Sequence, residues 1–160
     1  MNPFNSLDKI PVVIIAAGKS TRTYPLTETR PKTLLPVANK EILAHNIDAV
    51  KEFASEIILI IGCQKEMIVS FIEKKYPELQ IKYVEQSEQL GTGHALTLAR
   101  ELLPERFMVM MSDDLYSRED IEKCLSHKCS ILSMEVQNPE CFGVITSENG
   151  IMTGLVEKPK

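Results

Sequence analysis

The alternation of short apolar runs with stretches of helical periodicity is the feature that most constrains the fold of this chain. Four runs rich in apolar and β-branched residues predict strands at 12–16, 57–61, 81–84 and 107–111. The segments between them space their apolar residues as amphipathic helices do, and the predicted buried faces comprise Leu43, Ile47, Val50 and Ala54; Ile68, Phe71 and Ile72; and Ala95, Leu98, Ala99 and Leu102. Repeated βαβ units of this kind are typical of an α/β fold with a mostly parallel sheet and flanking helices.

The last third of the chain predicts another helix and further strands. Ser117, followed three residues later by Asp120, has the pattern of a helix N-cap ahead of Ile121. Residues 131–136, 143–146 and 151–156 predict strands, and Asn149-Gly150 between the last two is a hairpin-turn signal. Because 160 residues, 44% of them hydrophobic, suffice for one core, we expect a single folded domain over residues 1–160.

Charge and composition disfavour several classes of function. A formal net charge of -4 argues against general nucleic-acid binding, which needs many Lys and Arg side chains to neutralise phosphates. The sequence contains neither a secretory signal pattern nor an apolar run approaching the roughly 20 residues that span a bilayer. We therefore expect a cytoplasmic protein without membrane contact. The cysteines are expected to be free thiols, with a metal site at Cys124, His127 and Cys129 as the alternative.

The segment from residue 12 to residue 37 contains the most informative motif. A predicted buried strand runs into the small residues Ala17 and Gly18, which brings backbone N–H groups to the sheet edge where open α/β sheets bind ligands. The glycine spacing matches neither a G-x-x-x-x-G-K-[ST] phosphate loop nor a G-x-G-x-x-G fingerprint. Arg22 and Lys32 flank a loop with two prolines, so both cations could converge on one phosphate chain. The alternative is two solvated surface charges.

The same segment resembles the signature of the sugar-phosphate nucleotidylyltransferases, in Ala16 to Arg22, Pro25 to Thr27, Arg30 to Lys32 and Leu34 to Val37. Later segments resemble the family in the same order: 86–96, 111–116, and Phe142-Gly143-Val144 followed by Glu157-Lys158-Pro159. The likeness is to the N-terminal part of UDP-N-acetylglucosamine pyrophosphorylases and of glucose-1-phosphate uridylyl- or thymidylyltransferases. It implies a Rossmann-like fold of the nucleotide-diphospho-sugar transferase type. It also implies transfer from a nucleoside triphosphate, UTP or dTTP, to a sugar 1-phosphate, with Mg²⁺ and release of pyrophosphate.

The resemblance implies a role for each matching residue. Arg22 and Lys32 would hold the phosphates and stabilise the charge on departing pyrophosphate. Nucleotide would be bound by Ala16, Ala17, Gly18, Gln86, Gly91 and Thr92, sugar phosphate by Gly143, Glu157 and Lys158, and Mg²⁺ by Asp113, with Asp114 as a second candidate. From the residues alone, Asp113 and Asp114 could instead cap the next element, and Glu157-Lys158 could be an exposed charged pair. His94 is expected to be structural, because an anionic sugar phosphate needs no proton removed.

The sequence departs from the family pattern at Ser20, Thr23, Glu41 and Ser112. Ser20 stands where a glycine is usual, so it either crowds the loop or adopts a backbone angle that serine takes up reluctantly. The chain also ends soon after Pro159, where the family continues and supplies a second metal ligand. These departures leave open an active enzyme, an inactive fragment, a homo-oligomer that completes the site, or a non-catalytic nucleotide-binding or interaction module on the same fold.

Overall fold

The structure, a computed structural model, describes residues 9–159. The chain divides into two compact units, Met1–Lys128 and Cys129–Lys160, where the sequence led us to expect one. Within the described residues, the strands after residue 128 pair only with each other, and residues 129–138 form neither helix nor strand. No backbone ladder therefore continues the sheet of the first unit. The assignment of residues 1–160 to one nucleotidyltransferase domain stays a prediction.

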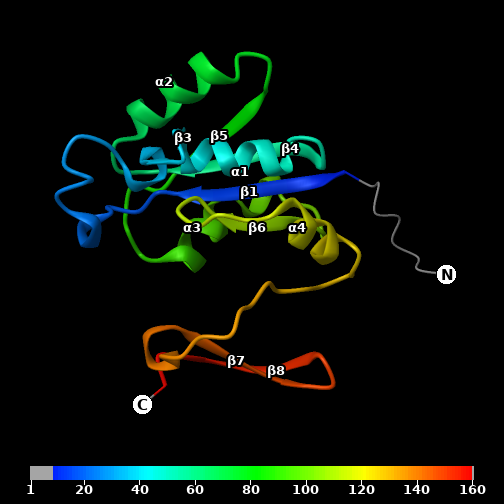
Figure 1. The fold of residues 1–160 in the computed structure, drawn as a ribbon. Coiled ribbons are helices and arrows are strands. Elements are labelled where there is room, and N and C mark those ends of the chain that lie inside the picture. Colours follow the sequence, from blue (N-terminus) through cyan, green and yellow to red (C-terminus); the bar gives the residue numbers. More distant parts are fainter. Residues whose placement is uncertain (1–8, 160) are drawn as a thin grey trace. The chain divides into compact units, whose positions relative to one another are not determined.

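A parallel sheet organises the first unit (Figure 1). Its strands are β1 (Ile10–Ala16), β4 (Ala54–Ile61), β5 (Ile81–Glu85) and β6 (Met108–Met111), in the order β5-β4-β1-β6. These strands confirm the four predicted runs. In the register of the central strand, Ile15 pairs with Ile60 of β4 and with Met111 of β6. Because all four strands are parallel, their carboxyl ends meet at one edge of the sheet.

The two faces of β1 contact two separate cores, since alternate side chains of a strand point to opposite faces. On one face, Val12 and Ile14 pack with the buried residues of α1 (Ile42–Val50), α2 (Lys65–Lys75) and α4 (Arg118–Leu125). On the other face, Val13 and Ile15 pack with Ala95 of α3 (Thr92–Leu98). Figure 1 shows α2 and α3 on opposite sides of β1. The predicted α/β fold with flanking helices is confirmed.

The predicted helix faces are mostly buried, with three corrections. Ala54 begins β4 and does not belong to α1. Leu98 and Leu102 are 42% and 38% exposed, because the core contacts are made by the small residues Ala95 of α3 and Ala99 directly after it. Leu102 also lies in the 3-10 turn η3 (Arg100–Leu102), where the period of 3.6 residues no longer holds.

The predicted N-cap of α4 is confirmed. The Ser117 hydroxyl oxygen accepts a hydrogen bond from the Asp120 backbone N–H at 3.1 Å. This bond satisfies one of the backbone donors that a helix start leaves free.

Short elements connect β1 to α1 beside the carboxyl edge of the sheet. They are η1 (Thr21–Thr23), η2 (Lys32–Leu34), β2 (Pro36–Val37) and β3 (Lys40–Glu41), of which β2 and β3 pair antiparallel. Thr33 and Leu34 of η2 are buried. Their burial anchors the middle of this long connection to the first unit.

The second unit contains η4 (Pro139–Cys141) and an antiparallel hairpin of β7 (Gly143–Glu148) and β8 (Ile151–Glu157). Asn149 and Gly150 have φ values of 51° and 77°, which confirms the predicted turn. The strand predicted at residues 131–136 is wrong, since this segment has no strand conformation. A strand needs a partner for its backbone ladder, and within the described residues no strand pairs with this segment.

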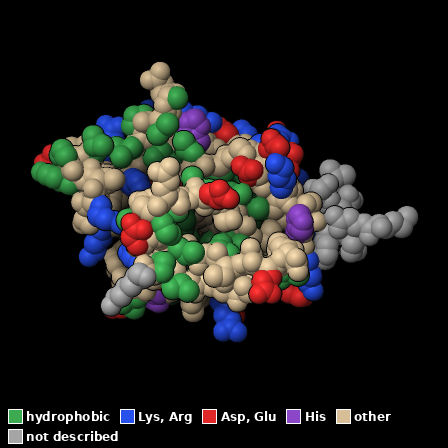
Figure 2. Space-filling view, turned by 60° about the horizontal axis from the view of Figure 1, so that its bottom comes forward, with side chains coloured by type: hydrophobic (Ala, Val, Ile, Leu, Met, Phe, Trp, Pro, Cys, Tyr) green, Lys and Arg blue, Asp and Glu red, His purple; other side chains and the backbone are tan. Residues whose placement is uncertain are grey.

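The described residues bear on the expected absence of membrane spans, on the surface charge and on the state of the cysteines. Within residues 9–159, no helix is long and apolar enough to cross a membrane, and the cytoplasmic location stays a prediction. Figure 2 shows Lys and Arg side chains interspersed with Asp and Glu on the visible face. None of the four cysteines in this range is disulfide-bonded, which confirms the expected thiols. No group of three His, Cys, Asp or Glu residues in this range could hold a metal, so the site at Cys124, His127 and Cys129 is wrong; the His127 Nδ1 lies 2.9 Å from the Lys123 carbonyl oxygen instead.

Candidate functional site

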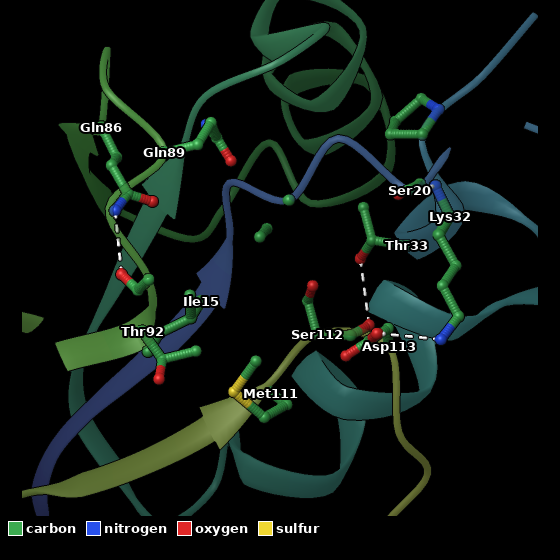
Figure 3. Close-up of a pocket in the computed structure, with 14 residues that line it drawn as sticks. Ile15, Ser20, Lys32, Thr33, Gln86, Gln89, Thr92, Met111, Ser112 and Asp113 are labelled. Atoms are coloured by element: carbon green, nitrogen blue, oxygen red, sulfur yellow. Dashed lines mark hydrogen bonds and ion pairs between the residues drawn. The ribbon is translucent and has the colours of Figure 1, made fainter. Parts of the chain in front are cut away.

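A cavity of ≈ 200 Å³ lies at the carboxyl edge of the four-stranded sheet (Figure 3). Its walls come from the ends of β1 and β6, the connection after β1, and the segment between β5 and α3. The lining residues are Ile15, Ala16, Gly18, Ser20, Pro31, Lys32, Thr33, Gln86, Gln89, Gly91, Thr92, Met111, Ser112 and Asp113. The structure thus brings together residues that the sequence assigned to nucleotide, phosphate and metal from three distant segments.

The turn after β1 forms one wall of the cavity. Ala17 is buried beneath it, whereas Gly18 lines the cavity and has open space where a Cβ would stand. Ser20 adopts φ 56° and ψ 28°, the left-handed conformation that serine was expected to adopt reluctantly. Its carbonyl oxygen accepts hydrogen bonds from the Thr23 and Thr27 hydroxyls at 2.8 and 2.9 Å. Local hydrogen bonds therefore stabilise a backbone angle that glycine would adopt without them.

Lys32 and Asp113 form an ion pair at the wall beside Ser20 and across the cavity from Gln86 (Figure 3). Lys32 Nζ lies 2.9 Å from Asp113 Oδ2, and the two side chains are 33% and 37% exposed. The Lys32 backbone N–H donates to the Ser20 hydroxyl at 3.3 Å, so Ser20 holds the start of η2. Both side chains line the cavity, so a charged ligand there could replace Asp113 as the partner of Lys32, or Lys32 as the partner of Asp113.

The backbone around Asp113 is fixed by groups that the sequence analysis did not assign to the site. The Thr33 hydroxyl donates to the Ser112 carbonyl oxygen at 3.1 Å, and the Ser112 N–H donates to the Ile15 carbonyl oxygen at 3.1 Å. The fully buried Asn46 donates through Nδ2 to the Met111 carbonyl oxygen at 3.3 Å. A polar residue within the apolar face of a helix is the signal that could have identified Asn46.

Tyr116 also holds this segment. Its hydroxyl oxygen accepts a hydrogen bond from the Met111 N–H at 3.1 Å. Burial, together with the negative charges of Asp114 and Asp113, raises the pKa of Tyr116, although the bond from Met111 acts in the opposite direction. The side chain therefore stays a neutral hydroxyl and fixes the end of β6 beside the cavity.

Gln86 forms the wall on the side of β5. Its side chain is buried, and its backbone N–H donates to the Ile61 carbonyl oxygen at 2.8 Å. Its Nε2 donates to the Gly91 carbonyl oxygen at 3.0 Å and lies 3.1 Å from His94 Nδ1. Gly91 has φ 95° and ψ 176°, a conformation essentially restricted to glycine. Gln89, which the sequence analysis did not single out, lines the cavity beside Gln86.

Several predicted site residues lie elsewhere. Arg22, in η1, is exposed and does not line the cavity. Asp114, which follows β6, is also exposed and does not line the cavity. Gly143, Glu157 and Lys158 belong to the second unit and are exposed there. The Lys158 Nζ lies 3.8 Å from Glu157 Oε1, and the Lys158 N–H donates to the Phe142 carbonyl oxygen at 2.9 Å.

The donor set at the cavity allows at most a partial protein site for a divalent cation. Within the described residues, Asp113 is the only carboxylate that lines the cavity. Mg²⁺ prefers oxygen ligands and is commonly bound by one or two carboxylates together with water and substrate phosphates. Asp113 therefore fits the role of a single carboxylate ligand, with the remaining positions left to phosphate and water.

Comparison with known proteins gives a consistent assignment. A family model described as nucleotidyl transferase matches residues 11–160. The chain is 41% identical over 150 residues to the bifunctional protein GlmU of Methanocaldococcus jannaschii, covering 92% of this chain and 36% of that protein. It is 34% identical over 157 residues to the UTP–glucose-1-phosphate uridylyltransferase AglF of Haloferax volcanii, covering 92% and 65%.

Among solved structures, the chain is similar to a Bacillus anthracis protein assigned as a glucose-1-phosphate thymidylyltransferase and crystallised with sucrose. The TM-score is 0.77 at 27% sequence identity, over 93% of this chain and 64% of that one. This chain spans about a third of the length of the GlmU proteins that it matches.

Proposed function

The chain belongs to the nucleotidyl transferase family, and on that premise we propose that it binds a nucleoside triphosphate at the carboxyl edge of its sheet. The reaction is transfer of the nucleotidyl group to a sugar 1-phosphate, with UTP or dTTP as the favoured triphosphate. A phosphate oxygen of the sugar phosphate attacks the α-phosphorus as the bond to pyrophosphate breaks. Because the attacking oxygen is already anionic, positioning and charge stabilisation suffice, and no general base is required.

The observation that supports this proposal is the polarity of the cavity. The Gln86 carboxamide lies on one side, and the Lys32 and Asp113 charges lie on another (Figure 3). A hydrogen-bonding amide suits the edge of a base, whereas a lysine suits phosphate. At ≈ 200 Å³ the cavity is smaller than the roughly 300–1,000 Å³ of pockets that enclose a whole small molecule. It would therefore enclose part of the nucleotide and leave the rest towards solvent.

The residues on the base side would form the nucleoside subsite. Gln86 would contact the edge of the base, and Gly91 and Thr92 would offer backbone and hydroxyl groups beside it. Ala16 and Gly18 would lie against the nucleoside, and the open space at Gly18 leaves room for it. Ala17, which is buried, would support this turn from below.

The charged residues would form the phosphate subsite. Lys32 would exchange its ion pair with Asp113 for contacts to the phosphates when nucleotide binds. Arg22, on the same connection after β1, would add a second cation. Asp113 would hold Mg²⁺ through a carboxylate oxygen, and the ion, when bound, would neutralise phosphate charge. On the second unit, Gly143, Glu157 and Lys158 would bind the sugar phosphate, as their resemblance to the family motif implies.

A second candidate function is nucleotide binding without turnover. Asp113 is the only carboxylate among the described residues that line the cavity, and Ser20 replaces the usual glycine in the phosphate-side loop. Because these relatives are longer than this chain, turnover by this chain is a proposal. Homo-oligomer formation also stays a prediction.

Calorimetric titration with UTP, dTTP, CTP, GTP and ATP, each with and without Mg²⁺, tests the binding proposal. A pyrophosphate-release assay with glucose 1-phosphate and N-acetylglucosamine 1-phosphate then tests turnover. We expect Mg²⁺-dependent binding of UTP or dTTP with pyrophosphate release. Binding without release would favour the second candidate, and no binding of any triphosphate would reject the nucleotide site.

A further inference from the structure

The contact between His94 and Gln86 has a role that the proposed reaction does not assign. We propose that His94 is a positioning residue that fixes the Gln86 carboxamide with its oxygen towards the cavity. The site would thereby select pyrimidine bases that present an N–H donor at N3, uracil and thymine, over cytosine. This inference rests on the proposed function and names the determinant of its base preference.

The orientation of the carboxamide follows from its neighbours. A backbone carbonyl is only an acceptor, so the Gln86 atom 3.0 Å from the Gly91 oxygen must be the Nε2 donor. The second Nε2 hydrogen meets His94 Nδ1 at 3.1 Å, so the neutral ring accepts there and carries its proton on Nε2. Turning the amide over would place Oε1 against two acceptors. Both hydrogens are thus used, and Figure 3 shows the carboxamide oxygen directed to the cavity.

His94 adds a restraint that Gly91 alone does not supply. The Gly91 carbonyl oxygen also accepts the Ala95 N–H at 3.1 Å, so its bond to Gln86 is shared. The ring of His94 is half-buried in the first turn of α3, next to the fully buried Ala95. The packing of the helix on the sheet therefore fixes the acceptor that holds the amide. The Gln86 backbone is fixed independently by its bond to Ile61.

A fixed acceptor in the cavity distinguishes the pyrimidines by their N3 atoms. Uracil and thymine donate an N3–H to the Gln86 Oε1, whereas cytosine presents a lone pair at N3 and would face oxygen with an unpaired acceptor. Buried polar groups left without partners lower affinity more than a lost neutral contact does. Guanine also carries a ring N–H donor but is a larger purine. UTP and CTP have the same ring size, so their comparison isolates the effect of the carboxamide.

The test measures the dissociation constants of UTP and CTP by calorimetry for the parent chain and for His94→Phe, His94→Ala and His94→Asn. The parent is expected to prefer UTP. His94→Phe keeps a ring without an acceptor and should lower the ratio of UTP to CTP affinity roughly three- to tenfold, the range of one hydrogen bond. His94→Ala should do the same with less demand on packing. His94→Asn should keep the preference, because its Oδ1 can accept from Gln86.

The outcomes separate the inference from the proposed function. A merely structural His94 would change both dissociation constants together, and an unchanged ratio in His94→Phe and His94→Ala would overturn the inference. A parent chain that binds UTP and CTP equally would also overturn it, while leaving triphosphate binding intact. Absence of any triphosphate binding by the parent would reject the proposed function and this inference with it. Because each ratio is measured on one preparation, loss of folded protein does not mimic the effect.

Discussion

The cavity of the first unit and the hairpin of the second unit position their predicted site residues in different ways. Lys32 and Asp113 are about a third exposed and lie 2.9 Å apart, each on backbone that is tied to neighbouring elements. Glu157 and Lys158 are 70% and 61% exposed and lie 3.8 Å apart as sequence neighbours. An exposed pair of this kind contributes little to stability. At the first site the fold brings together two side chains that are distant in the sequence, whereas at the second the two side chains are sequence neighbours on one hairpin strand and its end.

The physical basis of this difference is the sheet. Four parallel strands with cores on both faces fix the positions of the loops that follow them. A hairpin of two strands is at best marginally stable by itself in water, and apolar residues such as Ile151, Leu155 and Val156 of β8 are exposed. We infer that the proposed nucleotide subsite is preorganised and that the residues proposed for the sugar phosphate depend on further contacts.

The largest effect is expected from Asp113→Asn, which tests the preorganised side. Turnover should fall roughly 100-fold or more, the scale on which one preorganised electrostatic contact acts, and the Mg²⁺-dependent part of UTP binding should disappear. The free energy of unfolding should change by less than about 1 kcal/mol, because the Lys32 pair is partly exposed. Pyrophosphate release, calorimetry and thermal unfolding measure the three quantities. Asp114→Asn, at an exposed position outside the cavity, is the matched comparison, and an equal loss there would show that Asp114 also contributes. Unchanged turnover in Asp113→Asn would remove Asp113 from its role.

A smaller and more selective effect is expected from Lys158→Ala in the hairpin. The KM for sugar 1-phosphate should rise about tenfold, as expected when one charge-assisted hydrogen bond is lost, while triphosphate affinity and stability stay the same. Lys128→Ala removes an equal charge from an exposed position and serves as the control. If Lys158→Ala weakens triphosphate and sugar phosphate equally, the division into two subsites is wrong.

Gly18→Ala tests whether open space beside β1 belongs to the ligand. A Cβ at Gly18 meets no protein atom within 4 Å, so the fold should tolerate it. UTP affinity should fall severalfold, because the methyl group would occupy space assigned to the nucleoside. Gly93→Ala is the matched control, since its Cβ also meets nothing and Gly93 does not line this cavity. Equal UTP affinity in both variants would place the nucleoside elsewhere.

The smallest effect is expected from Ser20→Gly. Relief of the left-handed strain, roughly 1–2 kcal/mol, is offset by the greater freedom of glycine in the unfolded chain and by loss of the 3.3 Å bond to Lys32. The net change in the free energy of unfolding should stay below about 1 kcal/mol in chemical denaturation. Ser20→Ala keeps the strain and loses the bond, so it should be less stable than Ser20→Gly. The reverse order would mean that the strain is relieved by other contacts.

Much of the fold could be predicted because the signals are local. The continuous apolar run of β1, the helical period of α1 and the Ser117 cap each depend on residues within one element or directly beside it. Errors occurred where a local signal lacked its tertiary partner. Residues 131–136 have a strand composition without a pairing strand, and Leu98 has helical spacing beside a core face made of alanines. The unassigned Asn46 and Thr33 donate to the carbonyl oxygens of Met111, at the end of β6, and of Ser112, directly after it, and no sequence pattern indicates those partners.

The sequence by itself determined the parallel α/β pattern, the turn after β1 and the family motif, because each depends on the type and spacing of residues within short segments. Only the tertiary structure decided which polar groups meet. Lys32 and Asp113 are 81 positions apart, and Asn46 and Met111 are 65 apart. These residues meet because parallel strands end at one carboxyl edge of the sheet. The order and register of the strands decide which loops lie side by side, and both depend on packing across the whole unit.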